Sequence, residues 1–264
     1  MIKRLSVLLL TISLLIGCSV ATQSFDNDNK SHTRTNNRED YPDDQSFANY
    51  REVNIGNIRQ NWLYRSSSPV NNGLNRSAYV LKLMEQDQIK TIIDLADNDE
   101  EIRQFLADPA LDLSYYRTIY DSGDIAMVDL GVEYLAYDFD QGMIKALRFM
   151  IDHPGPYLIH CNEGKDRTGY LLIIIEALLD ASYDQIAEDY MRSYVNYYFL
   201  KEDEETYKNI EEKRFKPLIY AIGKLESDND LSSIDLKQLS IDYLIRNGFS
   251  QKEIDQLIEV LVSD

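Results

Sequence analysis

The hydrophobic and polar positions of the chain divide it into two kinds of segment. Short apolar runs of strand length occur at residues 52–55, 62–65, 90–95, 114–119 and 157–159. Longer segments with the apolar spacing of a helix occur at residues 75–86, 100–106, 142–152 and 182–199. Strands that alternate with helices predict an α/β fold, with a central, mainly parallel sheet flanked by helices. In such sheets, ligands bind at the carboxyl ends of the strands.

The last part of the chain, residues 203–264, has no further strand-like run. Helical spacing occurs at 203–223 and 233–263, which predicts additional C-terminal helices. Asn247 and Gly248 form the expected stop between two of these helices, and Ser250 is the expected cap of the last one.

One helical segment, 182–199, carries a stripe of tyrosines. Its members are Tyr190, Tyr194, Tyr197 and Tyr198, at offsets that bring them to one face of a helix. Such a stripe is typical of core packing, and the alternative is an aromatic rim of a binding pocket.

The amino-terminal residues have the pattern of an export signal. Lys3 and Arg4 precede an apolar run, 5–16, that is too short to span a membrane as a helix, so residues 1–17 are predicted to be a signal peptide. The end of this run resembles a bacterial lipobox, which makes Cys18 the expected site of lipidation. The alternative is an uncleaved membrane anchor. Both interpretations place the rest of the chain outside the cytoplasm and beside the bacterial cell membrane.

Composition changes after the signal. Residues 18–45 are rich in Asn, Asp, Ser and Thr with little apolar periodicity, which predicts a disordered tether. Residues 46–264 are long enough for one sizeable domain. We therefore expect a tethered domain whose C-terminal helical part is about 203–264.

Charge and residue counts exclude several classes of partner and cofactor. The formal charge is −18, and cleavage after residue 17 would remove two basic residues and no acidic one, giving −20. A strongly acidic protein is a poor match for nucleic acid. The chain has two cysteines, each with a separate expected role, so no disulfide framework is predicted. Its three histidines form no cluster with metal-ligand spacing, and we expect neither a metal nor another cofactor.

The most informative segment is a ten-residue motif between the last predicted strand and an apolar helix, 171–175. It reads His160-Cys161-Asn162-Glu163-Gly164-Lys165-Asp166-Arg167-Thr168-Gly169. Cysteine attacks phosphorus efficiently as a thiolate, and the amino end of a helix favours both that anion and a bound phosphoryl group. The guanidinium of Arg167 presents a fork that can bind two phosphate oxygens. Gly164 permits a close turn, and Thr168 could donate its hydroxyl to the sulfur.

The motif resembles the signature of the cysteine-dependent protein tyrosine phosphatase superfamily, which is His-Cys, five residues, then Arg and Ser or Thr. Its Gly-Lys-Asp-Arg-Thr-Gly form is similar to that of bacterial tyrosine phosphatase-like proteins, which include secreted and lipoprotein enzymes acting on phosphotyrosine and phosphoinositides. Segments 50–53, 63–67 and 91–95 also resemble family segments. Where the family usually has an arginine after Asp-Leu, this chain has Ala96.

This resemblance implies Cys161 as nucleophile and a phosphate-binding loop formed by Asn162, Glu163, Gly164, Lys165, Asp166 and Arg167. Departure of the leaving oxygen requires a proton donor. The first candidate is Asp166, since bacterial relatives with Lys-Asp-Arg use the aspartate of the loop. The rivals are Asp124 and Asp121, in the segment that also holds Asp129, where many superfamily members carry a mobile aspartate.

The leading functional hypothesis is hydrolysis of phosphotyrosyl proteins or peptides through a phosphocysteine intermediate. The alternative is a phosphoinositide or inositol phosphate phosphatase, which Lys165 favours because a basic loop residue suits additional phosphates. A non-catalytic phospho-binding module is a third interpretation. A sulfur transferase or arsenate reductase is disfavoured because no resolving cysteine is present.

Overall fold

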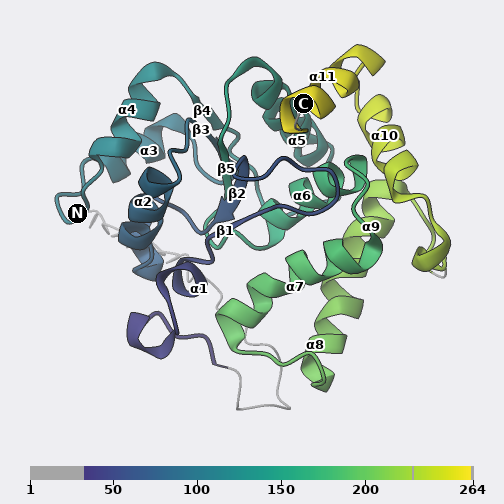
Figure 1. Ribbon diagram of the computed structural model, residues 1–264, viewed down its shortest axis with the longest axis horizontal. Coiled ribbons are helices and arrows are strands. Elements are labelled where there is room, and N and C mark those ends of the chain that lie inside the picture. Colours follow the sequence, from purple (N-terminus) through teal and green to yellow (C-terminus); the bar gives the residue numbers. More distant parts are fainter. Residues whose placement is uncertain (1–32, 228, 263–264) are drawn as a thin grey trace, which may run out of the picture. The chain divides into compact units, whose positions relative to one another are not determined.

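A computed structural model of the protein describes residues 33–227 and 229–262. A five-stranded sheet in the order β1-β2-β5-β3-β4 lies at its centre (Figure 1). The strands are β1 (Arg51–Glu52), β2 (Leu63–Ser66), β3 (Thr91–Asp94), β4 (Ile125–Met127) and β5 (Tyr157–His160). Only β1 is antiparallel to its neighbour within this sheet. The predicted α/β fold with a mainly parallel sheet is confirmed.

Helices cover both faces of the sheet (Figure 1). The N-terminal half contributes α1 (Asp44–Ala48), α2 (Ser77–Gln86), α3 (Asp99–Leu106) and α4 (Ser114–Ser122). The C-terminal half contributes α5 (Tyr137–Asp152), α6 (Asp166–Leu178), α7 (Tyr183–Tyr198), α8 (Glu205–Ile210), α9 (Lys216–Gly223), α10 (Leu236–Arg246) and α11 (Gln251–Leu261). Successive strand residues point to opposite faces. Accordingly, Ile92 and Leu158 join the apolar cluster under α2–α4, whereas Ile93 and Ile159 join the cluster of α5–α11.

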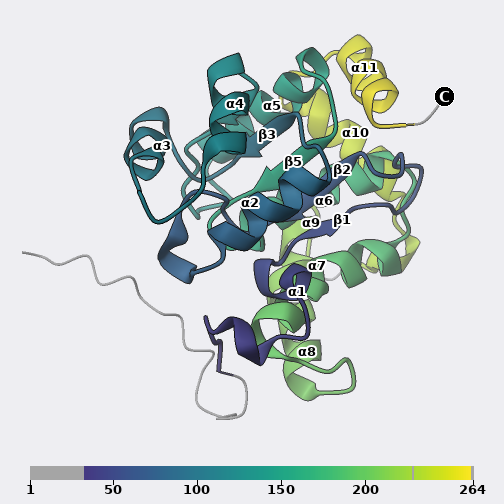
Figure 2. The ribbon, with the colours of Figure 1, turned by 60° about the vertical axis from the view of Figure 1, so that its left-hand side comes forward.

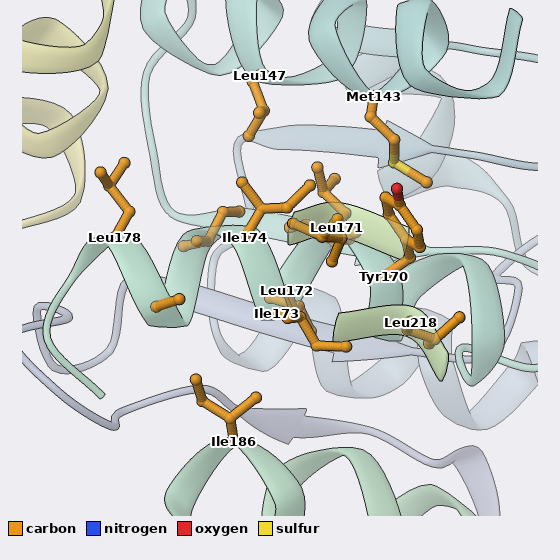
Figure 3. Packing of buried hydrophobic residues seen from close by; sticks show 14 of the residues in the cluster. Met143, Leu147, Tyr170, Leu171, Leu172, Ile173, Ile174, Leu178, Ile186 and Leu218 are labelled. Carbon is orange, nitrogen blue, oxygen red and sulfur yellow. The ribbon is translucent and has the colours of Figure 1, made fainter. Parts of the chain in front are cut away.

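Helix α6 is the centre of the larger cluster. Residues from Thr168 to Leu178 are all buried, as expected of a helix that is apolar all round. Figure 3 shows Met143 and Leu147 of α5 on one side of it, and Ile186 of α7 and Leu218 of α9 on the other. The amino end of α6 is therefore held by packing on several sides.

The predicted strand at 114–119 is wrong, because these residues form α4. Its β-branched and aromatic composition favours a strand, but the buried positions Leu113, Tyr116 and Ile119 are three apart, which is the spacing of a helix. The strand of this region is β4, whose three residues are too few to show an alternating pattern.

The other predicted elements agree with the structure to within a few residues, apart from the first strand and the helix at 142–152. The first strand is shorter than expected and begins at Arg51, while α5 begins at Tyr137. Segment 203–223 comprises α8 and α9, joined by the π-helical turn Glu211–Phe215. Asn247 and Gly248 separate α10 from α11, and Ser250 caps α11 by accepting from the backbone N–H of Glu253.

The tether predicted for 18–45 is wrong for residues 33–45, which pack on the domain. Tyr41 is buried, and Arg76 donates to its hydroxyl over 2.8 Å and to the carbonyl of Thr35 over 3.1 Å. One aromatic anchor and a buried arginine order this polar segment, which is why apolar periodicity did not reveal it. The helix that follows, α1, lies beside α7 (Figure 2).

The predicted signal peptide and Cys18 lie outside the described residues. Among the residues that are described, no helix combines the length and the apolar character needed to cross a membrane.

Candidate active site

The carboxyl ends of four strands meet at one edge of the sheet. His160, the last residue of β5, is in register with Ser66 of β2 and Asp94 of β3, and Asp94 is in register with Met127 of β4. The segments that follow these strands therefore gather at the same edge. Cys161 is the first residue after β5, so the sequence motif lies where α/β sheets bind ligands.

The loop from Cys161 to Lys165 turns tightly from β5 into α6. Gly164 has a φ of +63°, and a Cβ at this position would lie 1.9 Å from the carbonyl oxygen of Ser66. Only glycine fits both the backbone conformation and the contact. No side chain caps the amino end of α6, so the peptide N–H groups of its first turn remain the donors for a ligand.

Donors from outside the loop hold its carbonyl groups. The side-chain amide of Asn49 donates to the carbonyls of Glu163, over 3.0 Å, and Gly164, over 3.1 Å. The hydroxyl of Tyr197 donates to Glu163, and the guanidinium of Arg65 donates to Gly164 over 2.8 Å. In a trans peptide the N–H points away from the C=O. Fixing the carbonyls of Glu163 and Gly164 therefore also fixes the N–H groups of Gly164 and Lys165, which point in the opposite direction.

Arg65 is the centre of a buried charge network beneath the loop. Its side chain is completely buried and forms an ion pair with Asp189 of α7, which Arg51 also contacts over 2.8 Å. Burial opposes ionisation of Asp189, but the two arginines outweigh it and hold its pKa well below the usual range. Burial raises the pKa of the neighbouring Glu176 well above its ordinary value, with the charge of Asp189 adding to the effect. The pKa values of the two acids are thus shifted in opposite directions, so Asp189 is the member of the pair that ionises more readily.

Cys161 and Arg167 lie at this edge. Cys161 is 3% exposed, while its neighbour Asn162 is exposed and Arg167 is half-buried. Nη1 of Arg167 donates to the carbonyl of Leu130 over 2.7 Å, so the segment after β4 orients the guanidinium. The hydroxyl of Thr168 is buried and makes no hydrogen bond within the described part of the chain, so the expected contact with the sulfur is not formed.

Three titratable groups lie directly behind the loop: His160, Asp94 and Asp97. Nε2 of His160 is 3.7 Å from Oδ2 of Asp94, and all three side chains are buried. Burial lowers the pKa of His160 to about 4 and raises the pKa of Asp94 to about 7. Burial and the charge of Asp94 likewise raise the pKa of Asp97 to about 7. The carboxylate of Asp94 accepts hydrogen bonds from the backbone N–H groups of Ala96 and Asp97. Ala96 therefore lies in the turn that follows β3.

The candidate proton donors are separated by the fold. Asp166 is the first residue of α6, has a 60% exposed side chain and accepts from the hydroxyls of Tyr194, over 2.7 Å, and Tyr190, over 3.2 Å. Asp121 is exposed at the end of α4, and Asp124 precedes β4. Because β4 and β5 both run parallel to β3, these two lie near the amino ends of the strands, roughly 10 Å or more from the edge that holds Cys161.

Asp121 and Asp124 are therefore wrong as candidates for the proton donor. The expectation placed them after a strand at 114–119, and that strand is a helix. Asp129 does follow a strand carboxyl end, where it is exposed with a φ of +58°. Asp166 is a member of the motif itself and begins α6, at the edge of the sheet that holds Cys161.

The tyrosine stripe of α7 is a wall behind the loop. Tyr190, Tyr194 and Tyr197 are buried, which confirms the packing interpretation, and their hydroxyls also bind Asp166 and the carbonyl of Glu163.

Two surface cavities, of about 470 and 430 Å³, lie away from the loop, one near the carboxyl end of α6 and the other between α7 and α8.

Residues 45–263 match the tyrosine phosphatase family. The chain therefore belongs to this family, and its function is that of a phosphatase acting on phosphorylated substrates. No curated protein matches the chain.

Sequence reasoning missed Asn49, Asp189, Tyr197 as a loop donor, and Leu130. Asp189 could have been noticed as an acid next to the buried tyrosine stripe, a position where an unpaired charge is costly. Asn49 acts through its side-chain amide at the end of α1, and Leu130 acts through its backbone carbonyl. Neither role leaves a pattern in the sequence.

Arg65 is predicted to position the loop. Arg65→Lys keeps the charge beside Asp189 but removes the planar fork that also binds the carbonyl of Gly164. We expect kcat for p-nitrophenyl phosphate to fall about tenfold with a smaller change in KM, because the loop amides lose their alignment. Arg51→Lys is the matched control, since Arg51 pairs with Asp189 and touches no loop carbonyl. Equal losses in both variants would contradict a direct role.

Asp97→Asn is predicted to stabilise the protein at neutral and alkaline pH. The pKa of Asp97 rises from about 4 in the unfolded chain to about 7 in the fold, so ionisation favours unfolding progressively across this range. We expect the variant to gain about 1–3 kcal/mol in free energy of unfolding at pH 8, with the gain vanishing near pH 4. Urea denaturation between pH 4 and 8 measures it. The exposed Asp203→Asn should show no such trend, and a pH-independent gain at position 97 would refute the assignment.

Proposed function

We propose that the protein is a cysteine-dependent tyrosine phosphatase that acts through a phosphocysteine intermediate. The observation that carries this proposal is the hold on the loop carbonyls: Asn49, Arg65 and Tyr197 donate to the carbonyls of Glu163 and Gly164. In a trans peptide the N–H groups that follow these carbonyls point the opposite way. A ring of amide donors with a guanidinium beside it matches the equatorial oxygens of a transferring phosphoryl group.

The cycle has two steps. In the first, the thiolate of Cys161 attacks phosphorus, the S–P bond forms as the P–O bond to the alcohol breaks, and Asp166 gives its proton to the leaving oxygen. In the second, Asp166 takes a proton from a water that attacks phosphorus. The S–P bond then breaks, releasing inorganic phosphate and the thiolate.

Two further residues have roles in this cycle. The contact of Arg167 with Leu130 uses one nitrogen of a guanidinium that has five N–H donors, so the rest of the fork can bind phosphate oxygens. The hydroxyl of Thr168, which is buried beside the loop, donates to the sulfur when the thiolate leaves in the second step. Neither a metal nor another cofactor enters the cycle.

We also assign the protein to the outer side of a bacterial cell membrane, anchored through a lipid on Cys18. The support is the sequence of residues 1–18, in which two basic residues precede a short apolar run and a cysteine.

A phosphoinositide or inositol phosphate phosphatase is the second candidate. The observation that favours it is a lysine inside the phosphate loop, Lys165, because a cation at this position suits substrates with additional phosphates.

Cys161→Ser is expected to abolish hydrolysis of p-nitrophenyl phosphate and of phosphotyrosyl peptides. A serine hydroxyl is a far weaker nucleophile at neutral pH, so turnover should fall by roughly 10³-fold or more. Phosphate release by the reduced protein measures it, with vanadate as inhibitor and circular dichroism as the control for folding. Wild-type protein that binds phosphotyrosyl peptide without turnover would identify a non-catalytic module instead.

Asp166→Asn is expected to affect substrates according to their leaving group. Phenyl phosphate requires protonation of its leaving oxygen, so its turnover should fall about 100-fold, whereas p-nitrophenyl phosphate should lose much less. Asp124→Asn is the matched comparison, because Asp124 lies near the opposite end of the strands. A hundredfold loss in Asp124→Asn with unchanged turnover in Asp166→Asn would reverse the assignment.

A further inference from the structure

The side chain of Lys165 is already occupied by the protein itself. Its Nζ lies 2.9 Å from Oε2 of Glu163 and 3.7 Å from Oδ2 of Asp166, and the side chain is 7% exposed. The ammonium also lies over the ring faces of Tyr194, at 4.7 Å from the centroid, and Tyr198, at 5.4 Å. Lys165 is thus directed toward the aromatic wall of α7.

These contacts balance the positive charge of Lys165 with neighbouring carboxylates. Burial alone would lower the pKa of Lys165, but the carboxylates of Asp166 and Glu163 outweigh burial and raise it, so the side chain carries its proton. A buried ammonium that is paired and stacked on aromatic rings loses these interactions when it moves to another partner. Lys165 is therefore a poor ligand for a second phosphate.

Glu163 is the residue that most directly causes this neutralisation. Both of its carboxylate oxygens are paired: Oε2 with Lys165, and Oε1 with Arg34 of the N-terminal segment. Within the loop, Glu163, Lys165 and Asp166 together carry a net charge of −1 when both acids are ionised, and Arg34 brings this group to zero. The charge available for substrate phosphate is then that of Arg167, with the loop amides.

We propose that Glu163 determines the substrate class of this site: its carboxylate restrains Lys165 and repels a second phosphate, so the site selects singly phosphorylated substrates over polyphosphorylated ones. This inference rests on the proposed phosphatase function and specifies its substrate. A phosphotyrosyl side chain places one phosphate in the loop and none beside it. A phosphoinositide with two ring phosphates places additional negative charge next to the loop, where the carboxylate of Glu163 opposes it.

The test compares two substrates in the same full-length protein. The probes are a phosphotyrosyl peptide and water-soluble dioctanoyl phosphatidylinositol 4,5-bisphosphate, and the readout is the ratio of their kcat/KM values. In Glu163→Gln we expect the ratio to shift about five- to tenfold toward the bisphosphate, the size expected when one unit charge acting over several ångströms in a partly solvated pocket is removed.

A second variant acts in the opposite direction. Arg34→Gln removes the arginine that pairs with Glu163, so the negative charge of Glu163 is less well balanced. The ratio of kcat/KM values should then shift about two- to fivefold away from the bisphosphate. This variant lies outside the loop and keeps the proposal testable if the Glu163 variant does not fold. Glu259→Gln, exposed on α11, makes the same change in net charge as Glu163→Gln and should leave the ratio unchanged.

The outcomes separate this inference from the proposed function. An unchanged ratio in Glu163→Gln, an equal loss on both substrates, or a shift in the Glu259 control of the same size would overturn the role of Glu163 while leaving the phosphatase activity intact. Failure of the wild-type protein to hydrolyse p-nitrophenyl phosphate in a Cys161-dependent way would instead overturn the proposed function.

Discussion

The hydrogen bonds that fix the loop carbonyls are the constraint on which the rest of the site depends. A peptide has one donor and one acceptor on opposite sides, so fixing the acceptors of Glu163 and Gly164 fixes the direction of the donors beyond them. The groups that do this come from distant parts of the chain: Asn49 follows α1, Arg65 lies on β2, and Tyr197 lies on α7. The conformation of the loop is therefore a product of tertiary structure, even though its own sequence is short and continuous.

Two layers of charge support this loop. Beneath it, Arg65 and Arg51 share Asp189, whose pKa they lower, and Arg65 also donates to the carbonyl of Gly164. Above it, the acids beside Lys165 cancel the additional cation of the loop. The protein as a whole is strongly acidic, so attraction of a phosphate depends on local geometry rather than on long-range charge.

Much of this organisation could be predicted from the sequence. The strand and helix around Cys161 follow from an apolar triplet, a glycine turn and an apolar helix, and the C-terminal helices follow from their caps and spacing. The failures have a common cause. Segment 114–119 has strand-forming residues in a helix, and residues 33–45 are polar but ordered, because in both cases the deciding contacts are with residues far along the chain.

The same reason limits prediction of the site. Cys161, Gly164, Arg167 and Asp166 are recognisable because they are contiguous, and their spacing carries the chemistry. The positions of Asp121 and Asp124 could not be judged without the strand order and direction, and the pairing of Glu163 with Arg34 required knowledge that the N-terminal segment returns to the loop.

The position of Cys161 has a consequence for how the enzyme survives oxidants. It is the sole cysteine of residues 46–264, so a sulfenic acid formed on it has no second thiol in the domain with which to close an intramolecular disulfide. Protection against further, irreversible oxidation must then come from the small exposed area of the sulfur and from thiols supplied by the surroundings. A cysteine placed in this way depends on the redox state of its compartment more directly than one with a resolving cysteine in the same domain.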